Sequence, residues 1–143
     1  MKFEINENML IRNVLPSDWE DIMRIERKIV ITAGDFERLQ STFWVVEMDN
    51  QLVAYLVAEL VEDFLFIKHL VVASHVRGQG LGTLFLAFMK EICQQNKQTG
   101  LRLISPYQLL SYFSMNGFVD ENEFIDEKSD ILSYEMTWRN KER

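Results

Sequence analysis

The sequence has little of what would place the protein outside the cell, in a membrane or around a metal ion. Its single cysteine cannot form an internal disulfide, which fits a reducing compartment. No apolar run approaches the roughly 20 residues of a membrane span, and residues 1–7 lack the apolar stretch of a signal peptide. No group of histidine, cysteine and acidic residues has metal-site spacing. We therefore expect a cytoplasmic protein without a metal.

Positive charge is also scarce. The chain has 15 lysines and arginines against 22 aspartates and glutamates, a formal net charge of −7. Because phosphate backbones attract basic surfaces, this balance argues against nucleic acid as the main partner. An acidic protein suits a cationic ligand such as an amine, although ordinary solubility explains the same charge.

Glycine and proline are rare, with 6 and 2 among 143 residues, and no linker, repeat or low-complexity stretch interrupts the chain. At this length we expect one domain, residues 1–143. Hydrophobic residues make up 48% of the sequence and charged residues 26%. That composition is typical of a globular chain that can bury a core without disulfides.

Three of the six glycines alternate in one segment, Arg-Gly-Gln-Gly-Leu-Gly over residues 77–82, which we call the phosphate turn. It follows an apolar run, residues 64–73, that predicts a buried strand. It leads into residues 81–97, whose apolar side chains have the spacing of an amphipathic helix. Glycines leave the backbone N–H groups uncovered at the positive end of the helix dipole. The segment therefore predicts an anion site, most naturally for phosphates.

Other phosphate-binding motifs fit this segment less well. The third glycine of the dinucleotide-binding motif G-x-G-x-x-G would fall at Thr83, and the next predicted strand ends without an acidic residue to hold a ribose. A P-loop needs Gly-Lys-Ser/Thr at the start of its helix, and residues 80–83 contain no lysine. A purely structural role would make three alternating glycines a demanding coincidence.

The remaining patterns predict an α/β (α+β) fold with a single mixed, mostly antiparallel sheet of about 6–7 strands and about four helices. Ser17 and Glu20 fit a capping box at the start of the first helix. A helix between two neighbouring strands predicts one parallel crossover at the phosphate turn. The strands are expected at 9–14, 42–48, 51–61, 64–73, 101–105 and 131–138, the helices at 16–30, 35–41, 81–97 and 106–116, the turns at 49–50 and 62–63, and a loop with some strand character at 120–130.

This order of elements, with this turn, resembles the GNAT superfamily of N-acetyltransferases over nearly the whole chain. The most specific match is Leu-Val-Val at 70–72 followed by the phosphate turn. It is similar to the family's acetyl-CoA signature, (Arg/Gln)-x-x-Gly-x-(Gly/Ala), placed after its central strand. A second match is Leu-Ser-Tyr-Phe-Ser-Met-Asn-Gly-Phe at 110–118, which is similar to the helix ending in Gly-Phe that closes the family's site.

The resemblance implies a GNAT fold and acetyl-CoA as co-substrate. It implies that an acetyl group passes to a primary amine by direct attack in a ternary complex. Backbone amides of residues 78–83 would hold the pyrophosphate, and pantetheine would pair along Leu70 and Val72. A backbone N–H near Val72 would polarise the thioester carbonyl. The residues that the resemblance assigns to acetyl-CoA are Leu70, Val71, Val72, Arg77, Gly78, Gln79, Gly80, Leu81, Gly82 and Thr83.

The base and the acid are open in the sequence. An alkylammonium acceptor has a pKa of about 10.4 and must lose a proton, for which His69 and Glu59 are the candidates. Each also fits a structural role. Many family members carry a tyrosine four residues before the Gly-Phe glycine, and this tyrosine protonates the leaving thiolate. Here the residue at that position is Phe113. Tyr112 is adjacent, about 100° away around a helix. Either Tyr112 protonates the thiolate, or the thiolate, with a pKa of about 8.5, leaves unaided, or the protein is slow or inactive.

Two function classes therefore stay open. One is an enzyme that acetylates a small amine or a peptide amine. The other is a catalytically weak or inactive GNAT-fold module that binds acyl-CoA or a protein partner. The family's acceptor segments, here residues 16–41 and 120–130, are acidic in places, which predicts a cationic acceptor. We expect neither nucleic acid nor a membrane as partner, and a homodimer is consistent with the family.

Overall fold

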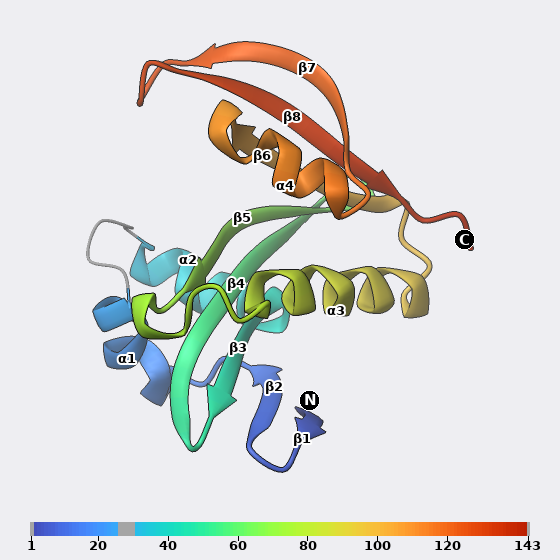
Figure 1. Cartoon of the computed structure of the whole chain (residues 1–143). Helices are drawn as coiled ribbons and strands as arrows, with labels where there is room; N and C mark the ends of the chain where they lie inside the picture. The colour runs from blue at the N-terminus through green and yellow to red at the C-terminus, as the bar shows by residue number, and fades with distance from the viewer. Residues whose placement is uncertain (1, 26–30, 143) are drawn as a thin grey trace. The chain divides into compact units, whose positions relative to one another are not determined.

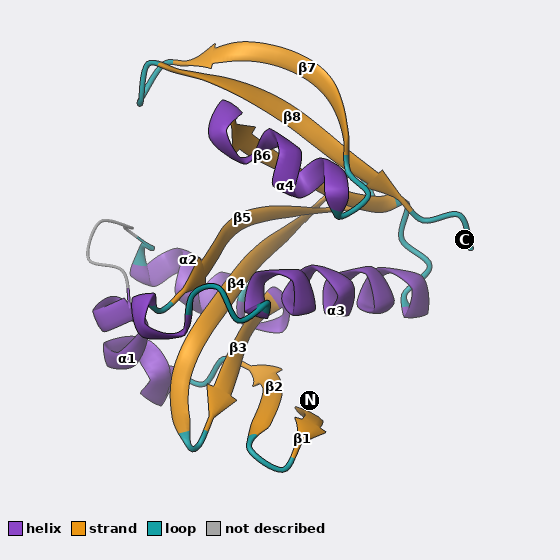
Figure 2. Ribbon diagram, viewed as in Figure 1, coloured by secondary structure: helices purple, strands orange, loops and turns teal. Residues whose placement is uncertain are grey.

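The computed structural model describes residues 2–25 and 31–142 of the chain. Within these residues eight strands form one mixed sheet, whose hydrogen-bonded neighbours follow the order β1-β2-β3-β4-β5-β6-β8-β7. Four α-helices accompany it, which confirms the predicted fold class with slightly more strands than expected (Figures 1 and 2). The elements are β1 (Lys2–Asn6), β2 (Met9–Asn13), α1 (Trp19–Ile25), α2 (Ala33–Arg38), β3 (Phe43–Met48), β4 (Gln51–Val61), β5 (Phe64–Val72), α3 (Leu81–Gln95), β6 (Gly100–Pro106), α4 (Leu110–Met115), β7 (Val119–Asp126) and β8 (Ile131–Arg139).

Two edge strands account for the larger sheet. β1 and β7 stand at the two ends of the strand order, and most of their side chains are exposed. Lys2–Asn6 does alternate polar and apolar residues, but the segment is short and the sequence prediction does not include it. β7 begins with Val-Asp-Glu-Asn-Glu, which contains one apolar residue, and its segment is predicted only as a loop with some strand character.

The other predicted boundaries agree with the structure to within a few residues. β4 has the predicted bounds. The predicted turns, Asp49-Asn50 and Glu62-Asp63, hold positive φ angles between 50° and 71° at both residues. Positive φ at both central residues is typical of the tightest hairpin turns, and Asn and Asp tolerate it best. The helix predicted at 16–30 is present up to Ile25, and its last part lies outside the described residues.

The start of α1 differs from the predicted capping box. A 3-10 helix over residues 16–18 precedes α1, and the Asp18 carboxylate accepts the backbone N–H of Leu15 at 2.7 Å. Ser17 therefore lies inside the first turn and does not precede it. The capping-box pattern predicted the right helix, but the capping carboxylate is that of Asp18 and not that of Glu20. Asp18 is also held by Arg12, a contact that a local motif does not contain.

The described residues group into two compact units, and the first comprises residues up to Glu59 together with His69–Gly82. Its strands β1 to β4 pair antiparallel in sequence order. The core of this unit joins α1 and α2 to the sheet. It consists of the buried side chains Val14, Ile22, Ile31, Phe36, Leu39, Phe43, Val45, Tyr55, Val57 and Val71.

A run of four aromatic rings fixes both helices on the sheet of the first unit. Trp19 of α1 contacts Phe36 of α2 edge-on, with ring centroids 4.9 Å apart. Phe36 contacts Phe43 of β3 at 5.5 Å, and Phe43 contacts Tyr55 of β4 at 5.8 Å. Each such pair contributes about 0.5–1.5 kcal/mol beyond the buried area. The aromatic run thus specifies where α1 and α2 pack.

The second unit comprises Leu60–Lys68 and the described residues from Thr83 onward. Its part of β5 pairs in parallel with β6 over Phe64–Phe66, and β6 pairs antiparallel with β8, which pairs with β7. Because α3 connects β5 to β6, the predicted parallel crossover is confirmed. The buried side chains of α3 in this unit are Phe85, Leu86, Phe88, Met89, Ile92 and Cys93.

A substitution at Gly100, the first residue of β6, tests the packing of the second unit. A Cβ here would run into the backbone carbonyl of Trp138 on β8. We therefore expect Gly100→Ala to lower the free energy of unfolding by about 1–3 kcal/mol. In the matched control, Gly34→Ala, the Cβ would meet only Thr32 Oγ1, at 3.9 Å, and alanine favours the helix by about 0.5–1 kcal/mol. Urea denaturation measures both variants. Unchanged stability of Gly100→Ala would contradict the pairing of β6 with β8.

Candidate functional site

The phosphate turn connects β5 to α3 through a left-handed backbone. After β5, residues 74–76 form a 3-10 helix. Gly78 and Gly80 then hold φ angles of +82° and +80°. A Cβ built at either glycine would meet no atom within 4 Å. Glycine is therefore required by the backbone conformation and not by lack of room, and the space in front of the turn is open.

The N-terminus of α3 supplies unpaired donors directly after the turn. α3 is 15 residues long, and the first four N–H groups of any α-helix have no acceptor within the helix. The helix dipole adds partial positive charge at the same end. Leu81 is 3% exposed and anchors the first turn in the core, whereas Thr83 is exposed. The arrangement suits a phosphate or another anion.

Arg77 closes the turn against the end of β5. Its Nε donates to the Val72 carbonyl at 3.0 Å. The next residue of the strand, Ala73, donates its backbone N–H to the Val53 carbonyl at 2.8 Å. The predicted ligand Arg77 therefore also holds the turn in place, while its side chain stays exposed to solvent.

The predicted residues on β5 lie on alternate sides of the strand. Val71 is buried in the core of the first unit. Side chains two residues apart share a face of a strand, so His69 lies on the side of Val71, and Leu70 and Val72 lie on the other. His69, Leu70 and Val72 are half-buried. The structure thus places the candidate base His69 directly beside Leu70 in the strand.

Glu59, the other candidate base, is paired with an arginine. Arg38 of α2 donates to its two carboxylate oxygens at 2.6 and 3.4 Å, and Arg38 also binds Asp35 at 2.9 Å. The hydrogen bond to Glu59 is the largest cause of a raised Arg38 pKa. A proton moving to Glu59 would therefore compete with this ion pair. Its evident role in the structure is to join β4 to α2.

Tyr112 and Thr83, both predicted site residues, meet in the second unit. The Tyr112 hydroxyl lies 3.1 Å from Thr83 Oγ1, in the first turn of α3. Phe113, which stands where family members carry tyrosine, is 8% exposed and packs edge-on against Phe118 with ring centroids 5.9 Å apart. The hydroxyl on α4 therefore points to the start of α3, and position 113 belongs to the core.

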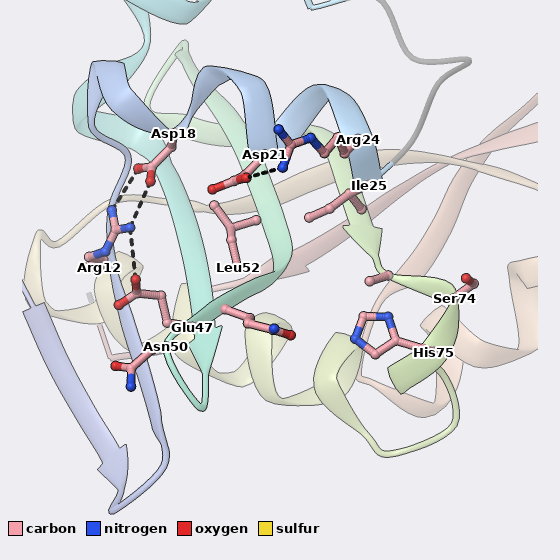
Figure 3. Close-up of a pocket in the computed structure, with 12 residues that line it drawn as sticks. Arg12, Asp18, Asp21, Arg24, Ile25, Glu47, Asn50, Leu52, Ser74 and His75 are labelled. Atoms are coloured by element: carbon pink, nitrogen blue, oxygen red, sulfur yellow. Dashed lines mark hydrogen bonds and ion pairs between the residues drawn. The ribbon is translucent and has the colours of Figure 1, made fainter.

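Sequence reasoning missed a polar pocket in the first unit, whose side chains Figure 3 shows. On one side of it, Arg12 of β2 donates to both Asp18 oxygens at 2.8 and 2.9 Å and to Glu47 of β3 at 3.4 Å. Burial raises the pKa of Asp18, but hydrogen bonds from Arg12 and the Leu15 N–H outweigh it, so the pKa lies below its usual value. Arg12 thus ties the start of α1 to two strands.

Asp18→Asn tests this network. The Asp18 and Arg12 side chains are 9% and 15% exposed. Among the described residues, Asp18→Asn leaves Arg12 with only the 3.4 Å contact to Glu47 as a charge partner, so we expect a loss of about 3 kcal/mol in unfolding free energy at pH 7. Because the folded-state pKa of Asp18 is lowered, wild-type stability from this pair is complete above the ordinary value of 3.8 and lost as pH falls through the folded value.

The measurement is urea denaturation of both proteins from pH 7 down to pH 3. The difference between them should shrink at the acid end, because protonation removes the wild-type advantage. Glu20→Gln is the control, since its side chain is 85% exposed and its contact with Arg24 spans 3.8 Å. Equal stability of Asp18→Asn and Glu20→Gln at pH 7 would rule out the structural role given to Asp18.

Metal-ligating side chains do not converge in the part of the chain that the structure describes, where no three His, Cys, Asp or Glu residues could share an ion. None of the helices described is long and apolar enough to cross a bilayer. Cys93, the one cysteine, is buried on α3.

Comparison with known proteins agrees with the geometry of the turn. Residues 40–120 match the family model described as an acetyltransferase (GNAT) domain. The matched segment contains β3 to α4 and the whole phosphate turn. No curated protein sequence matches the chain significantly.

Several solved structures share the fold at low sequence identity. The ribosomal-protein-S18-alanine N-acetyltransferase from Escherichia coli superposes with a TM-score of 0.78 at 14% identity, covering 92% of this chain and 93% of that one. Ard1 from Thermoplasma volcanium gives 0.81 at 19% identity, covering 92% and 97%. The PaiA N-acetyltransferase from Thermoplasma acidophilum, in complex with coenzyme A, gives 0.74 at 15% identity, covering 92% and 98%. At these identities the likeness concerns the fold.

The family model covers more than half of the chain and contains the strand, the glycine turn and the helix described above. The chain therefore belongs to the GNAT family of acetyltransferases.

Proposed function

We propose that the protein transfers an acetyl group from acetyl-CoA to a primary amine by direct attack in a ternary complex. The observation that carries the proposal is the phosphate turn, where left-handed glycines and the N-terminus of α3 present backbone donors to open space. Such a site fits the pyrophosphate of acetyl-CoA. The acceptor would be a small amine or a peptide amine, and a cationic one suits the net charge of −7.

In this proposal the donor lies along β5 and the turn. The amides of residues 78–83 hold the pyrophosphate, and Arg77 adds a positive charge beside them. Pantetheine pairs along Leu70 and Val72, where the Val72 carbonyl already accepts from Arg77. A backbone N–H near Val72 donates to the thioester oxygen, where negative charge develops in the transition state.

The reaction needs a neutral amine. The nitrogen lone pair attacks the thioester carbonyl carbon, the C–N bond forms, and the C–S bond breaks with its electron pair going to sulfur. The extra proton on nitrogen passes to a base. We assign this role to His69, ahead of Glu59. The support for this choice is that Glu59 is already engaged by Arg38 at 2.6 Å.

The leaving thiolate is proposed to depart without a protein acid. Phe113 has no hydroxyl and packs in the core. The Tyr112 hydroxyl is directed to Thr83. Since a thiol has a pKa of about 8.5, its thiolate is a tolerable leaving group. Tyr112 then acts as a positioning residue that steadies the first turn of α3 against the donor. Phe113 also supports the alternative of a weak or inactive acyl-CoA-binding module.

Isothermal titration with acetyl-CoA tests the donor site. We expect micromolar binding by the wild type and at least a tenfold loss for Gly80→Val. A β-branched residue resists a φ of +80°, and its side chain would fill the open space in front of the turn. Gly34→Val is the matched control, because Gly34 has an ordinary backbone and lies on α2. Absence of wild-type binding at millimolar acetyl-CoA would refute the donor site.

Tyr112→Phe separates a positioning role from an acid role. If the hydroxyl only binds Thr83, its loss removes about 0.5–1.5 kcal/mol. The KM for acetyl-CoA should then rise about two- to tenfold, with kcat nearly unchanged. CoA release with a screened amine acceptor measures both constants. Tyr107→Phe, at a 54% exposed residue, is the control. A hundredfold fall in kcat, with loss of the alkaline limb of the pH profile, would instead make Tyr112 the acid.

A further inference from the structure

The polar pocket of the first unit has the size of a ligand site. Its volume is about 490 Å³, within the range of about 300–1,000 Å³ usual for small-molecule pockets. Asp21 and Arg24 of α1 line one wall, and Glu47 of β3 and Asn50 of the hairpin turn line another. His75, in the 3-10 helix before the phosphate turn, lines it as well (Figure 3).

Neither Leu70 nor Val72, the residues proposed to hold the thioester end of the donor, lines the pocket. Between α1 and the sheet, the core holds Ile22, 1% exposed, and Val71, 6% exposed, with Leu52 packed against it. Leu52 also lines the pocket. The pocket therefore begins where this core ends, at the residues of the β3–β4 turn, and reaches Ala73, which directly follows Val72. A ligand here need not be the acetylated amine.

The arginines of the pocket are already matched to carboxylates. Arg12 donates from Nη1 and Nη2 to Asp18 and from Nη2 to Glu47. Arg24 donates to Asp21 at 3.3 Å and lies 3.8 Å from Glu20. A phosphate or carboxylate ligand would have to displace these partners. The pocket is therefore poorly suited to an anion.

Two carboxylates of the pocket, by contrast, can still accept hydrogen bonds. Among the described residues Glu47 is paired only through Oε1 and Asp21 only through Oδ1, so one oxygen of each carboxylate is available. The two arginines and the three carboxylates of the lining sum to a formal charge of −1. Ile25 and Leu52 supply apolar surface beside these oxygens. An ammonium on a short alkyl chain matches this combination of charge, acceptors and apolar surface.

We propose that this pocket binds a small alkylammonium ligand. The ammonium donates to the available oxygens of Glu47 and Asp21, and the alkyl chain packs on Leu52 and Ile25. The site does not depend on the donor site or on acetyl transfer. It would give the protein a second place for a cation, with its wall two residues from Arg77 and the phosphate turn.

The experiment is a titration of the ¹⁵N-labelled full chain, without acetyl-CoA, monitored by amide chemical shifts. The probe is n-butylammonium, and the matched probes are n-butanol and butyrate, which keep the alkyl chain and change the charge. We expect saturable shifts at Gln51, Leu52, Ser74 and His75 with n-butylammonium alone. Equal shifts with n-butanol, or no saturation with n-butylammonium, would overturn the proposal.

Two variants make the test specific. Asp21→Asn and Glu47→Gln should each weaken n-butylammonium binding at least threefold, whereas Glu91→Gln, on the exposed side of α3, should leave it unchanged. Asp21 has a side chain that is 52% exposed, so its substitution should not disturb folding. Acetyl-CoA titration of the same variants separates this site from the donor site. Wild-type affinity for n-butylammonium in both pocket variants would contradict the assignment.

Discussion

The left-handed backbone at Gly78 and Gly80 is the constraint on which the candidate donor site depends. Two positive φ angles turn the chain from β5 into α3 without placing a side chain over the amides. The turn is held from both sides, by the Arg77 bond to Val72 and by the buried face of α3. A diphosphate would therefore meet donors that folding has already oriented, which lowers the entropy lost on binding.

The neighbouring residues Tyr112 and Phe113 show how packing can decide chemistry in this fold. The inward position on α4 is filled by the phenyl ring of Phe113 against Phe118, and the hydroxyl is carried by the preceding residue, Tyr112, and reaches Thr83. The first unit shows a related principle. Its charged pocket is shaped by Arg12, which uses its hydrogen bonds to connect β2 with the start of α1 and with β3. The contact of Tyr112 with Thr83 and the contact of Arg12 with Glu47 each place a side chain through a partner distant in sequence.

Most of the fold followed from local patterns, because apolar periodicity and turn residues specify each element separately. The phosphate turn was predictable for the same reason, since its glycines and the helix after them are contiguous. The contacts that were missed join distant residues: Arg12 and Glu47 are 35 positions apart, Arg38 and Glu59 are 21, and Thr83 and Tyr112 are 29. No local pattern contains such pairs. The capping prediction at Ser17 was wrong because Arg12 orients Asp18.

The most direct measurement of the central claim compares the affinity of the wild-type chain for acetyl-CoA and for S-acetylpantetheine, which lacks the nucleotide and its phosphates. If the turn at residues 77–82 holds the pyrophosphate, acetyl-CoA should bind at least a hundredfold more tightly, and raised salt should reduce that difference. Equal affinities for the two compounds would mean that the phosphates contribute nothing. The turn would then be a feature of the fold and not the donor site.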